Sequence, residues 1–197
     1  MSVKDVVARR FSTRDLDPSK KISDNDINTI LEAGMKAPNG FGMEAWKFVV
    51  LSGNMEKVKE ACFGQPWMGN VSHAIVLFGA TEENIKANPG LLIEKFKANG
   101  FPDGFEEKVF GSLDGYFTQY NREQTYFAAS QMILQATDLG LGSVAVGGYD
   151  GEALAKLAKV DTKEYLPSLV IMLGYSNVEF KGRNNKAFDE VVTKIEL

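Results

Sequence analysis

With 197 residues, the chain is long enough for one compact domain and too short for two ordinary ones. Its hydrophobic share of 44% and charged share of 24% are typical of globular proteins, and they disfavour disorder, collagen-like fibres and disulfide scaffolds. The 22 basic and 26 acidic side chains give a formal net charge of −4, which argues against generic nucleic-acid binding but leaves room for a local basic pocket.

The chain contains one cysteine, Cys62, and one histidine, His73. An intramolecular disulfide and a zinc site built from cysteine and histidine are therefore both excluded. We expect His73 to be a hydrogen-bonded structural residue at the mouth of a strand, and Cys62 to be packed in the fold. Hydrolase chemistry through either side chain is not expected, and neither is a bound metal.

The apolar runs at 74–80 and 169–174 are too short to cross a bilayer as helices. The first residues contain no apolar segment of the kind that secretory signals carry. We therefore expect a cytoplasmic protein that has neither a membrane nor a nucleic acid as its partner.

The first part of the chain begins with a basic segment, since residues 1–21 hold six basic and three acidic side chains. Ser23 followed by Asp26 is a capping pattern, and it predicts a helix that residues 38–40 (Pro-Asn-Gly) bring to an end. Three further elements are predicted in order: a buried strand at 46–51, a short amphipathic helix at 54–62 and a second buried strand at 74–80.

Residues 86–122 differ from the rest because seven aromatic side chains alternate there with charged residues and glycine. Two amphipathic helices joined by a turn at 99–102 fit this pattern. Two interpretations stay open: an excursion with its own small core, or a mobile aromatic cover over a ligand site. The aromatic candidates for such a cover are Phe101, Phe105, Phe110, Tyr116, Phe117 and Tyr120.

Residues 125–137 contain no charged side chain, so a helix there must be covered on most of its faces. It runs either through the core of one chain or through an interface between two chains. After it, the pattern predicts a strand at 143–149, a helix at 152–159, a strand at 168–173 and an extended tail. Because no repeat or linker is visible, residues 1–197 are expected to form a single domain.

Residues 140–145 match the dinucleotide-binding pattern G-x-G-x-x-G/A as a string. That motif requires a strand before the glycines and a helix after them, so that the helix N-terminus faces the pyrophosphate. Here a helix is predicted before the glycines and a strand after them. We therefore interpret these glycines as a helix C-cap and a tight turn.

Basic side chains near both ends of the chain form a candidate anion site. Arg10, Ser12 and Arg14 alternate, so an extended segment would place them on one face. Lys181 and Arg183 repeat the same spacing near the other end. Together these side chains could bind one phosphate, for which arginine offers paired donors. Scattered surface charge remains the alternative.

Four segments, in this order, resemble the FMN-dependent nitroreductase family. They are Arg-Arg-Phe-Ser-Thr-Arg at 9–14, Ala-Pro-Asn-Gly at 37–40 with the strand that follows, Leu-Gly-Leu-Gly-Ser at 139–143, and Leu-Gly-Tyr at 173–175 followed by Lys-Gly-Arg at 181–183. The resemblance covers essentially the whole chain and is weakest at 86–122. It implies an α+β protein with a three-layer α/β/α fold, a mixed sheet flanked by helices, and a C-terminal segment that extends onto the partner of a homodimer. Residues 86–122 would then be a helical excursion that covers the active site.

The resemblance also implies an activity. Members of this family are oxidoreductases whose noncovalently bound FMN accepts a hydride from NAD(P)H and then passes electrons, in a ping-pong mechanism, to nitroaromatic compounds, quinones or similar electron-poor acceptors. The hydride is carried by flavin N5, so no catalytic side chain is expected. NADH and NADPH both remain candidate donors.

Twelve residues match cofactor-binding positions of the family. They are Arg10, Phe11, Ser12, Arg14, Asn39, Gly40, Met43, Gln65, Gly147, Gly148, Lys181 and Arg183. The two basic segments match phosphate positions, except that Arg14 matches a cation that stabilises negative charge at N1 and O2 of the ring. The loop at 39–43 corresponds to one that the second subunit lays near the flavin. Gly147 and Gly148 match the backbone beside N5, and Gln65 is assigned to the ring edge.

Three segments depart from the family pattern. Residues 64–67 (Gly-Gln-Pro-Trp) stand where many relatives have a polar or basic residue, and Gly147 stands where many have an acidic one. Residues 41–45 lack the small polar residues and the Gln-Pro pair that are common there. These departures support an alternative function, a flavin-binding or sensing module of the same fold with little turnover.

Overall fold

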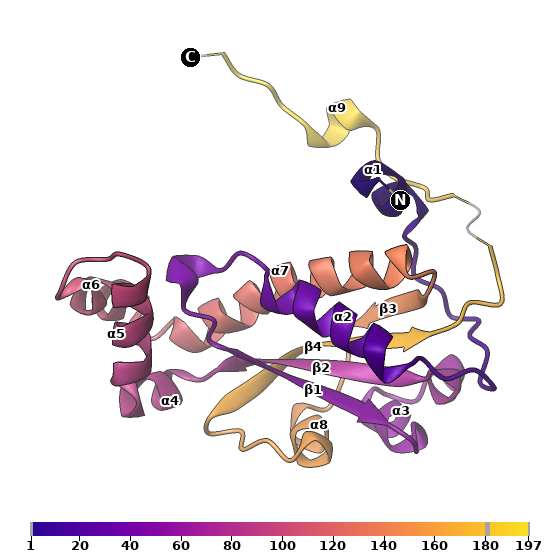
Figure 1. Ribbon diagram of the computed structural model, residues 1–197, viewed down its shortest axis with the longest axis horizontal. Helices are drawn as coiled ribbons and strands as arrows, with labels where there is room; N and C mark the ends of the chain where they lie inside the picture. The colour runs from indigo at the N-terminus through magenta and orange to yellow at the C-terminus, as the bar shows by residue number, and fades with distance from the viewer. Residues whose placement is uncertain (1, 180–181, 197) are drawn as a thin grey trace.

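A four-stranded sheet lies at the centre of the computed structural model, which describes residues 2–179 and 182–196. Helices cover both faces of this sheet, so the fold has three layers (Figure 1). The strands are β1 (Trp46–Ser52), β2 (His73–Ala80), β3 (Gly142–Val146) and β4 (Tyr165–Gly174). Their order is β1-β2-β4-β3, which places the most apolar strands, β2 and β4, in the middle.

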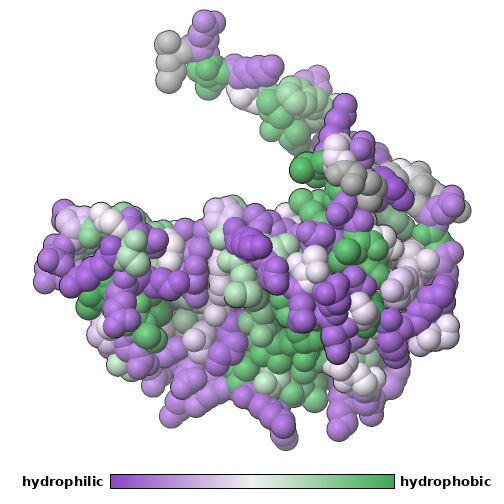
Figure 2. Space-filling view, viewed as in Figure 1, coloured by the Kyte–Doolittle hydropathy of each residue, from purple (hydrophilic) through white to green (hydrophobic). Residues whose placement is uncertain are grey.

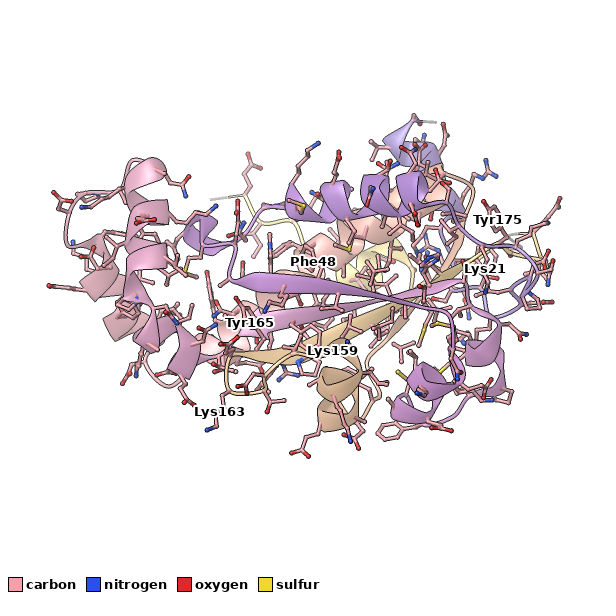
Figure 3. All side chains as sticks on the ribbon, turned by 60° about the horizontal axis from the view of Figure 1, so that its bottom comes forward. Lys21, Phe48, Lys159, Lys163, Tyr165 and Tyr175 are labelled. Atoms are coloured by element: carbon pink, nitrogen blue, oxygen red, sulfur yellow. The ribbon has the colours of Figure 1, made fainter. Side chains whose placement is uncertain are left out.

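All pairings between these strands are antiparallel, where a mixed sheet was expected. The connection from β1 to β2 starts and finishes at the same end of the strands, and so does the connection from β3 to β4. The neighbouring strands that they join therefore run in opposite directions. A parallel contact exists outside the named strands, as a bridge between Ser12 and Ser143. With the bottom of the molecule turned toward the viewer, β4 crosses the sheet from Tyr165 at its start to a point just before Tyr175 (Figure 3).

Alternate residues of β2 face two separate hydrophobic layers. Ile75 and Leu77 pack with α2 (Asp24–Met35) and α7 (Phe117–Asp138), which cover one face of the sheet. Val76 and Phe78 pack on the opposite face. That face is covered by three short elements, α3 (Glu56–Ala61), the 3-10 helix η2 (Pro66–Asn70) and α8 (Gly151–Ala158). The expected three-layer α+β fold is thereby confirmed.

Helix α7 contains the uncharged stretch at 125–137. It buries Ala128, Met132 and Ala136 against the sheet. Its other face carries Tyr126 and Phe127, which are 52% and 53% exposed in the single chain. The helix is therefore a core element on one side and presents aromatic side chains to solvent on the other.

Residues between β2 and α7 form three further helices at one end of the sheet (Figure 1). These are α4 (Glu82–Ala87), α5 (Pro89–Ala98) and α6 (Phe105–Leu113). Phe96 and Phe117 are buried at their centre, and the rings of Phe101 and Phe105 stack with centroids 4.3 Å apart. Phe41, from the 3-10 helix η1 (Gly40–Gly42), adds edge-on contacts. The excursion thus has its own core, as the first of the two interpretations states.

Both ends of the described chain lie on the side of α7 that faces away from the sheet, where α1 (Val3–Arg9) is close to the C-terminal segment (Figure 1). The tail with α9 (Phe188–Val191) extends clear of the body, and Figure 2 shows apolar residues gathered on it. Phe188 and Ile195 are 66% and 78% exposed. Among the described helices, none is both long and apolar enough to cross a membrane.

Candidate functional site

The segment between α1 and α2 is extended, as the alternation of its side chains requires. Ser12 forms the bridge to Ser143 of β3, and the Thr13 N–H donates to the Ser143 carbonyl at 3.4 Å. Thr13 is buried, whereas Ser12 and Arg14 are exposed on the opposite side. The basic segment therefore lies along the edge of the sheet with its polar groups facing outward.

Gly142 allows this close approach. A Cβ atom on Gly142 would lie 2.3 Å from Cγ2 of Thr13, so a side chain there would force the segment away from β3. The segment is also tied to the residues that follow β4. The hydroxyls of Thr13 and Ser176 lie 3.0 Å apart, and the Asp17 N–H donates to the Tyr175 carbonyl at 2.9 Å.

A cavity of about 540 Å³ opens beside Arg10. Its lining residues come from both ends of the chain and from the turn after α7, and they are Arg9, Arg10, Phe11, Thr137, Gly140, Leu141, Gly142, Ser176, Val178 and Glu179. Burial and then the neighbouring charge of Arg183 lower the pKa of Arg10. Two guanidinium groups from opposite ends of the chain therefore lie close together. Such an arrangement favours an anionic ligand.

The two arginines have different hydrogen-bond partners. Arg10 Nη1 lies 3.4 Å from Ser12 Oγ, so the first two residues of the alternating pattern do face one another. Arg183 Nη2 donates to the Val7 carbonyl of α1 at 3.0 Å. Lys181, the other basic residue expected here, lies outside the described residues. Arg10, Ser12 and Arg183 are thus brought together as the anion-site prediction requires.

A smaller cavity of about 190 Å³ adjoins the other end of the basic segment. Arg14, Gln65, Gly147 and Gly148, four of the residues named from the sequence, all line it. They come from three segments of the chain that lie far apart in sequence. The remaining lining residues are Cys62, Phe63, Trp67, Val144, Ala145 and Val146. Ala145 also lines a further cavity, of about 270 Å³, to which Arg10 contributes.

Bare backbone forms one wall of the smaller cavity. Strand β3 ends at Val146, three residues earlier than the predicted end, because its ladder with β4 stops at Val170. Gly147 and Gly148 follow and are exposed. A Cβ atom on Gly147 would meet nothing within 4 Å, so main-chain groups there are accessible to a ligand.

Cys62 and His73 have the structural roles expected of them. Cys62 is buried, and burial raises the pKa of its thiol to about 11, so it remains protonated at neutral pH. Nδ1 of His73 lies 2.9 Å from the hydroxyl of Ser72, which also accepts the Ile22 N–H at 2.9 Å. Within the described part of the chain, no cluster of His, Cys, Asp and Glu could hold a metal ion.

The glycines at 140–142 end a helix, as expected. Gly140 has a φ of +77°, and the Leu141 N–H donates back to the Ala136 carbonyl at 2.8 Å. This is a left-handed C-cap of α7. A strand, not a helix, follows this turn, so the dinucleotide-binding interpretation does not apply.

Asn39, Gly40 and Met43 lie elsewhere in the single chain. They belong to the η1 region near the excursion, where the Gly40 N–H donates to Gln124 Oε1 at 2.8 Å. Met43 is buried in the excursion core. None of the three lines either of the two cavities along the basic segment. Their assignment to a second subunit's site stays a prediction.

Two aromatic residues at the smaller cavity were not assigned from the sequence. Phe63, with a φ of 60°, ends α3 and presents its ring at the rim. The Trp67 indole N–H donates to Gln65 Oε1 at 2.8 Å, and its ring lies 6.0 Å from the Arg14 guanidinium carbon. The available signal in the sequence was that both aromatic residues lie two positions from Gln65. The sequence alone does not show whether their rings face the cavity.

A pair of guanidinium groups at one end of the basic segment suits an anionic group, and an exposed stretch of glycine backbone lies at the cavity on the other end. Comparisons with known proteins identify the class of the protein. Residues 7–175 match the model of the nitroreductase family, and the chain belongs to this family. Nitroreductases are oxidoreductases, so the expected class of enzyme is confirmed.

Relatives and solved structures agree with this assignment. Proteins named "Putative NAD(P)H nitroreductase" from Staphylococcus epidermidis and Haemophilus influenzae are each 32% identical to the chain, covering 95% and 93% of it and 94% and 92% of their own lengths. A nitroreductase-like protein from Streptococcus mutans has the same fold, with a TM-score of 0.84 at 22% identity and 98% of both chains covered. So does an Exiguobacterium sibiricum protein solved in complex with FMN, with a TM-score of 0.78 at 20% identity and 99% and 98% covered.

Proposed function

We propose that the chain is an FMN-dependent oxidoreductase that takes a hydride from NAD(P)H and passes electrons to nitroaromatic compounds, quinones or similar electron-poor acceptors. The observation that carries this proposal is the convergence of Arg14, Gln65 and the Gly147 backbone on one cavity, at the opposite end of the basic segment from the paired guanidinium groups of Arg10 and Arg183. The printed names of the relatives and the FMN in the Exiguobacterium sibiricum structure support the same donor and cofactor.

The residues fit FMN because they offer separate places for its charged and flat parts. Arg10, Ser12 and Arg183 would hold the phosphate through charge-assisted hydrogen bonds, with Lys181 as a further candidate. Arg14 and Gln65 would face the edge of the ring, and the exposed backbone at Gly147 would lie beside it. FMN held in this way supplies the hydride chemistry, so the protein needs to bind, orient and shield rather than to act as acid or base.

We further propose that the protein works as a homodimer. The apolar side chains of the tail, Phe188, Val191 and Ile195, are exposed in the single chain, as are Tyr126 and Phe127 of α7. Burial of both sets against a second copy would remove this apolar area from water. In such a dimer, residues 39–43 and the outer side chains of the excursion would reach the partner's cavity and cover it. Sedimentation velocity of the full chain tests this: a monomer at micromolar concentration contradicts it.

The cofactor is tested first, by recording the visible absorption spectrum of the purified protein before and after denaturation. We expect FMN to be released at about one molecule per chain, as one site per chain requires. A protein that is colourless and does not bind added FMN would contradict the proposed function.

Steady-state kinetics with NADPH or NADH and a quinone test the ping-pong mechanism. Because donor and acceptor would use the same cavity in turn, double-reciprocal plots should be parallel, and intersecting lines would contradict this scheme. Stopped-flow mixing with NAD(P)H separates the enzyme from the alternative, a flavin-binding module. Rapid bleaching of the flavin supports an enzyme, whereas bound FMN that is hardly reduced supports a binding or sensing module.

A further inference from the structure

A hydrogen bond at the rim of the smaller cavity fixes the direction of a side-chain amide. Trp67 Nε1 lies 2.8 Å from Oε1 of Gln65. An indole nitrogen can only donate, so the amide atom that faces it is the oxygen. The NH2 group of Gln65 then lies on the other branch of the planar amide, and it makes no hydrogen bond within the described part of the chain. The orientation of Gln65 therefore leaves two donors available.

The turn that carries Gln65 and Trp67 is held in place by its backbone. Phe63 and Gly64 take φ values of 60° and 77°, which end α3 and turn the chain toward η2. The Met68 N–H donates to the Gln65 carbonyl at 3.0 Å, and the Met68 side chain is fully buried. The fold thus fixes the backbone that carries both side chains, and the Trp67 N–H holds the exposed Gln65 amide.

Trp67 also supports the positive charge of the same cavity. The Arg14 guanidinium carbon lies 6.0 Å from the centre of the indole ring, at the limit of a cation–π contact. Arg14 forms no ion pair with a carboxylate among the described residues, so its charge is not neutralised locally. A guanidinium group has donors and no acceptor. Arg14 and Gln65 together therefore present donors only.

We propose that Trp67 is a positioning residue that holds Gln65 as a hydrogen-bond donor and, with Arg14, gives the cavity a donor-only edge for N1 and the C2 carbonyl of the flavin. This inference rests on the proposed function, because it takes FMN as the ligand of the cavity. Those two flavin atoms are acceptors that gain negative charge on reduction. The fixed amide thus favours binding of the reduced flavin, whereas a reversed amide would turn its oxygen toward the same charge.

The midpoint potential of bound FMN measures this effect directly. Trp67→Phe keeps an aromatic ring beneath Arg14 but removes the indole N–H, so the Gln65 amide is free to reverse. Loss of one hydrogen bond to a charged acceptor corresponds to about tenfold in the ratio of the dissociation constants of oxidised and reduced FMN. For a two-electron couple, tenfold is about 30 mV, so the potential should fall by about that amount. Gln65→Leu should lower it by a similar amount.

A double-mutant cycle shows whether Trp67 acts through Gln65. If it does, the double variant should shift the potential no further than Gln65→Leu alone. Trp46→Phe is the matched control, because Trp46 packs against Phe48 on β1, away from both cavities, and should leave the potential unchanged. Full addition of the two shifts, or no shift in Trp67→Phe, overturns the proposed role of Trp67 while FMN binding by the native protein leaves the proposed function standing. A native protein that binds no FMN overturns both.

The hydrogen bond can also be observed without the cofactor. In a 1H–15N spectrum of the flavin-free full chain, the two tryptophans give two indole N–H signals. Gln65 is exposed, so Gln65→Leu should fold normally, and it should shift the Trp67 signal upfield while the Trp46 signal stays in place. The direction assigned to the amide is wrong if the Trp67 signal does not move.

Discussion

The two aromatic regions of the molecule, the excursion core around Phe96 and the rim of the smaller cavity around Phe63, differ most in how their rings are used. Phe96 is 1% exposed and lies among other phenylalanine rings, whereas Phe63 is 71% exposed. Rings of the first kind stabilise their own segment, since burying a phenylalanine contributes about 1.5–3 kcal/mol. Rings of the second kind remain available to a ligand. An aromatic-rich sequence therefore does not by itself mark a ligand site.

The largest effect that we expect from this comparison is on stability. Phe96→Ala should lower the free energy of unfolding by about 3–5 kcal/mol, because it leaves a cavity in the excursion core. Phe63→Ala should change it by no more than about 0.5 kcal/mol, since an exposed ring loses few contacts. Urea unfolding of the two variants checks this, and equal losses would contradict the division into a core ring and a rim ring.

The affinity for FMN should depend on the charged residues of the cavities rather than on the rings of the excursion core. Arg14→Ala and Arg183→Ala should each weaken FMN binding by about ten- to a hundredfold, because a hydrogen bond to a charged group contributes about 1.5–3 kcal/mol. Lys57→Ala is the control, since it removes an exposed cation of the adjacent helix α3 and should leave the affinity as it is. Unchanged affinity in both arginine variants would refute the assigned roles.

Substitutions of two glycines should have smaller effects, one mainly on FMN affinity and the other only on stability. Gly147→Ala adds a methyl group where the chain itself leaves open space, so stability should change by less than about 0.5 kcal/mol while FMN affinity falls by roughly tenfold. Gly111→Ala in α6 also meets open space, and there the helix should gain up to about 1 kcal/mol with no change in affinity. Isothermal titration and thermal melts measure both quantities. A loss of stability without loss of affinity in Gly147→Ala would contradict the open wall.

The sequence predicted those elements that carry a local signal together with a buried face. Ser23 caps α2 through the Asp26 N–H, and the β-branched runs became β1 and β2. Helices α1 and α4 were missed, although Ser2 and Thr81 are capping residues of the same kind. Each of these helices is short and has one buried residue, so no hydrophobic periodicity marks it.

Less of the candidate site could be predicted, because its parts meet only in the folded chain. The spacing of Arg10, Ser12 and Arg14 predicted a shared face, which the bridge to β3 provides. Gln65 and Gly147 came from family resemblance, because their approach to Arg14 depends on the strand order rather than on a local pattern. The contact between Trp67 and Gln65 depends on a left-handed turn at a residue that is not glycine, which sequence rarely reveals.

The smallest expected effect concerns pH and the single histidine. Burial, helped by the charge of Lys21 and opposed by that of Asp24, lowers the pKa of His73 below its usual 6.5. Below about pH 6.5 the unfolded chain therefore binds a proton that the folded chain does not, and stability falls as the pH decreases toward the folded pKa. His73→Gln removes the titrating imidazole. The free energy of unfolding of this variant should therefore depend less on pH between about 7 and 5.5 than that of the native protein. Because carboxylates titrate in both proteins, the difference between the two urea-derived curves isolates the histidine. A difference that does not change with pH would mean that the imidazole is as accessible to protons in the fold as in the unfolded chain.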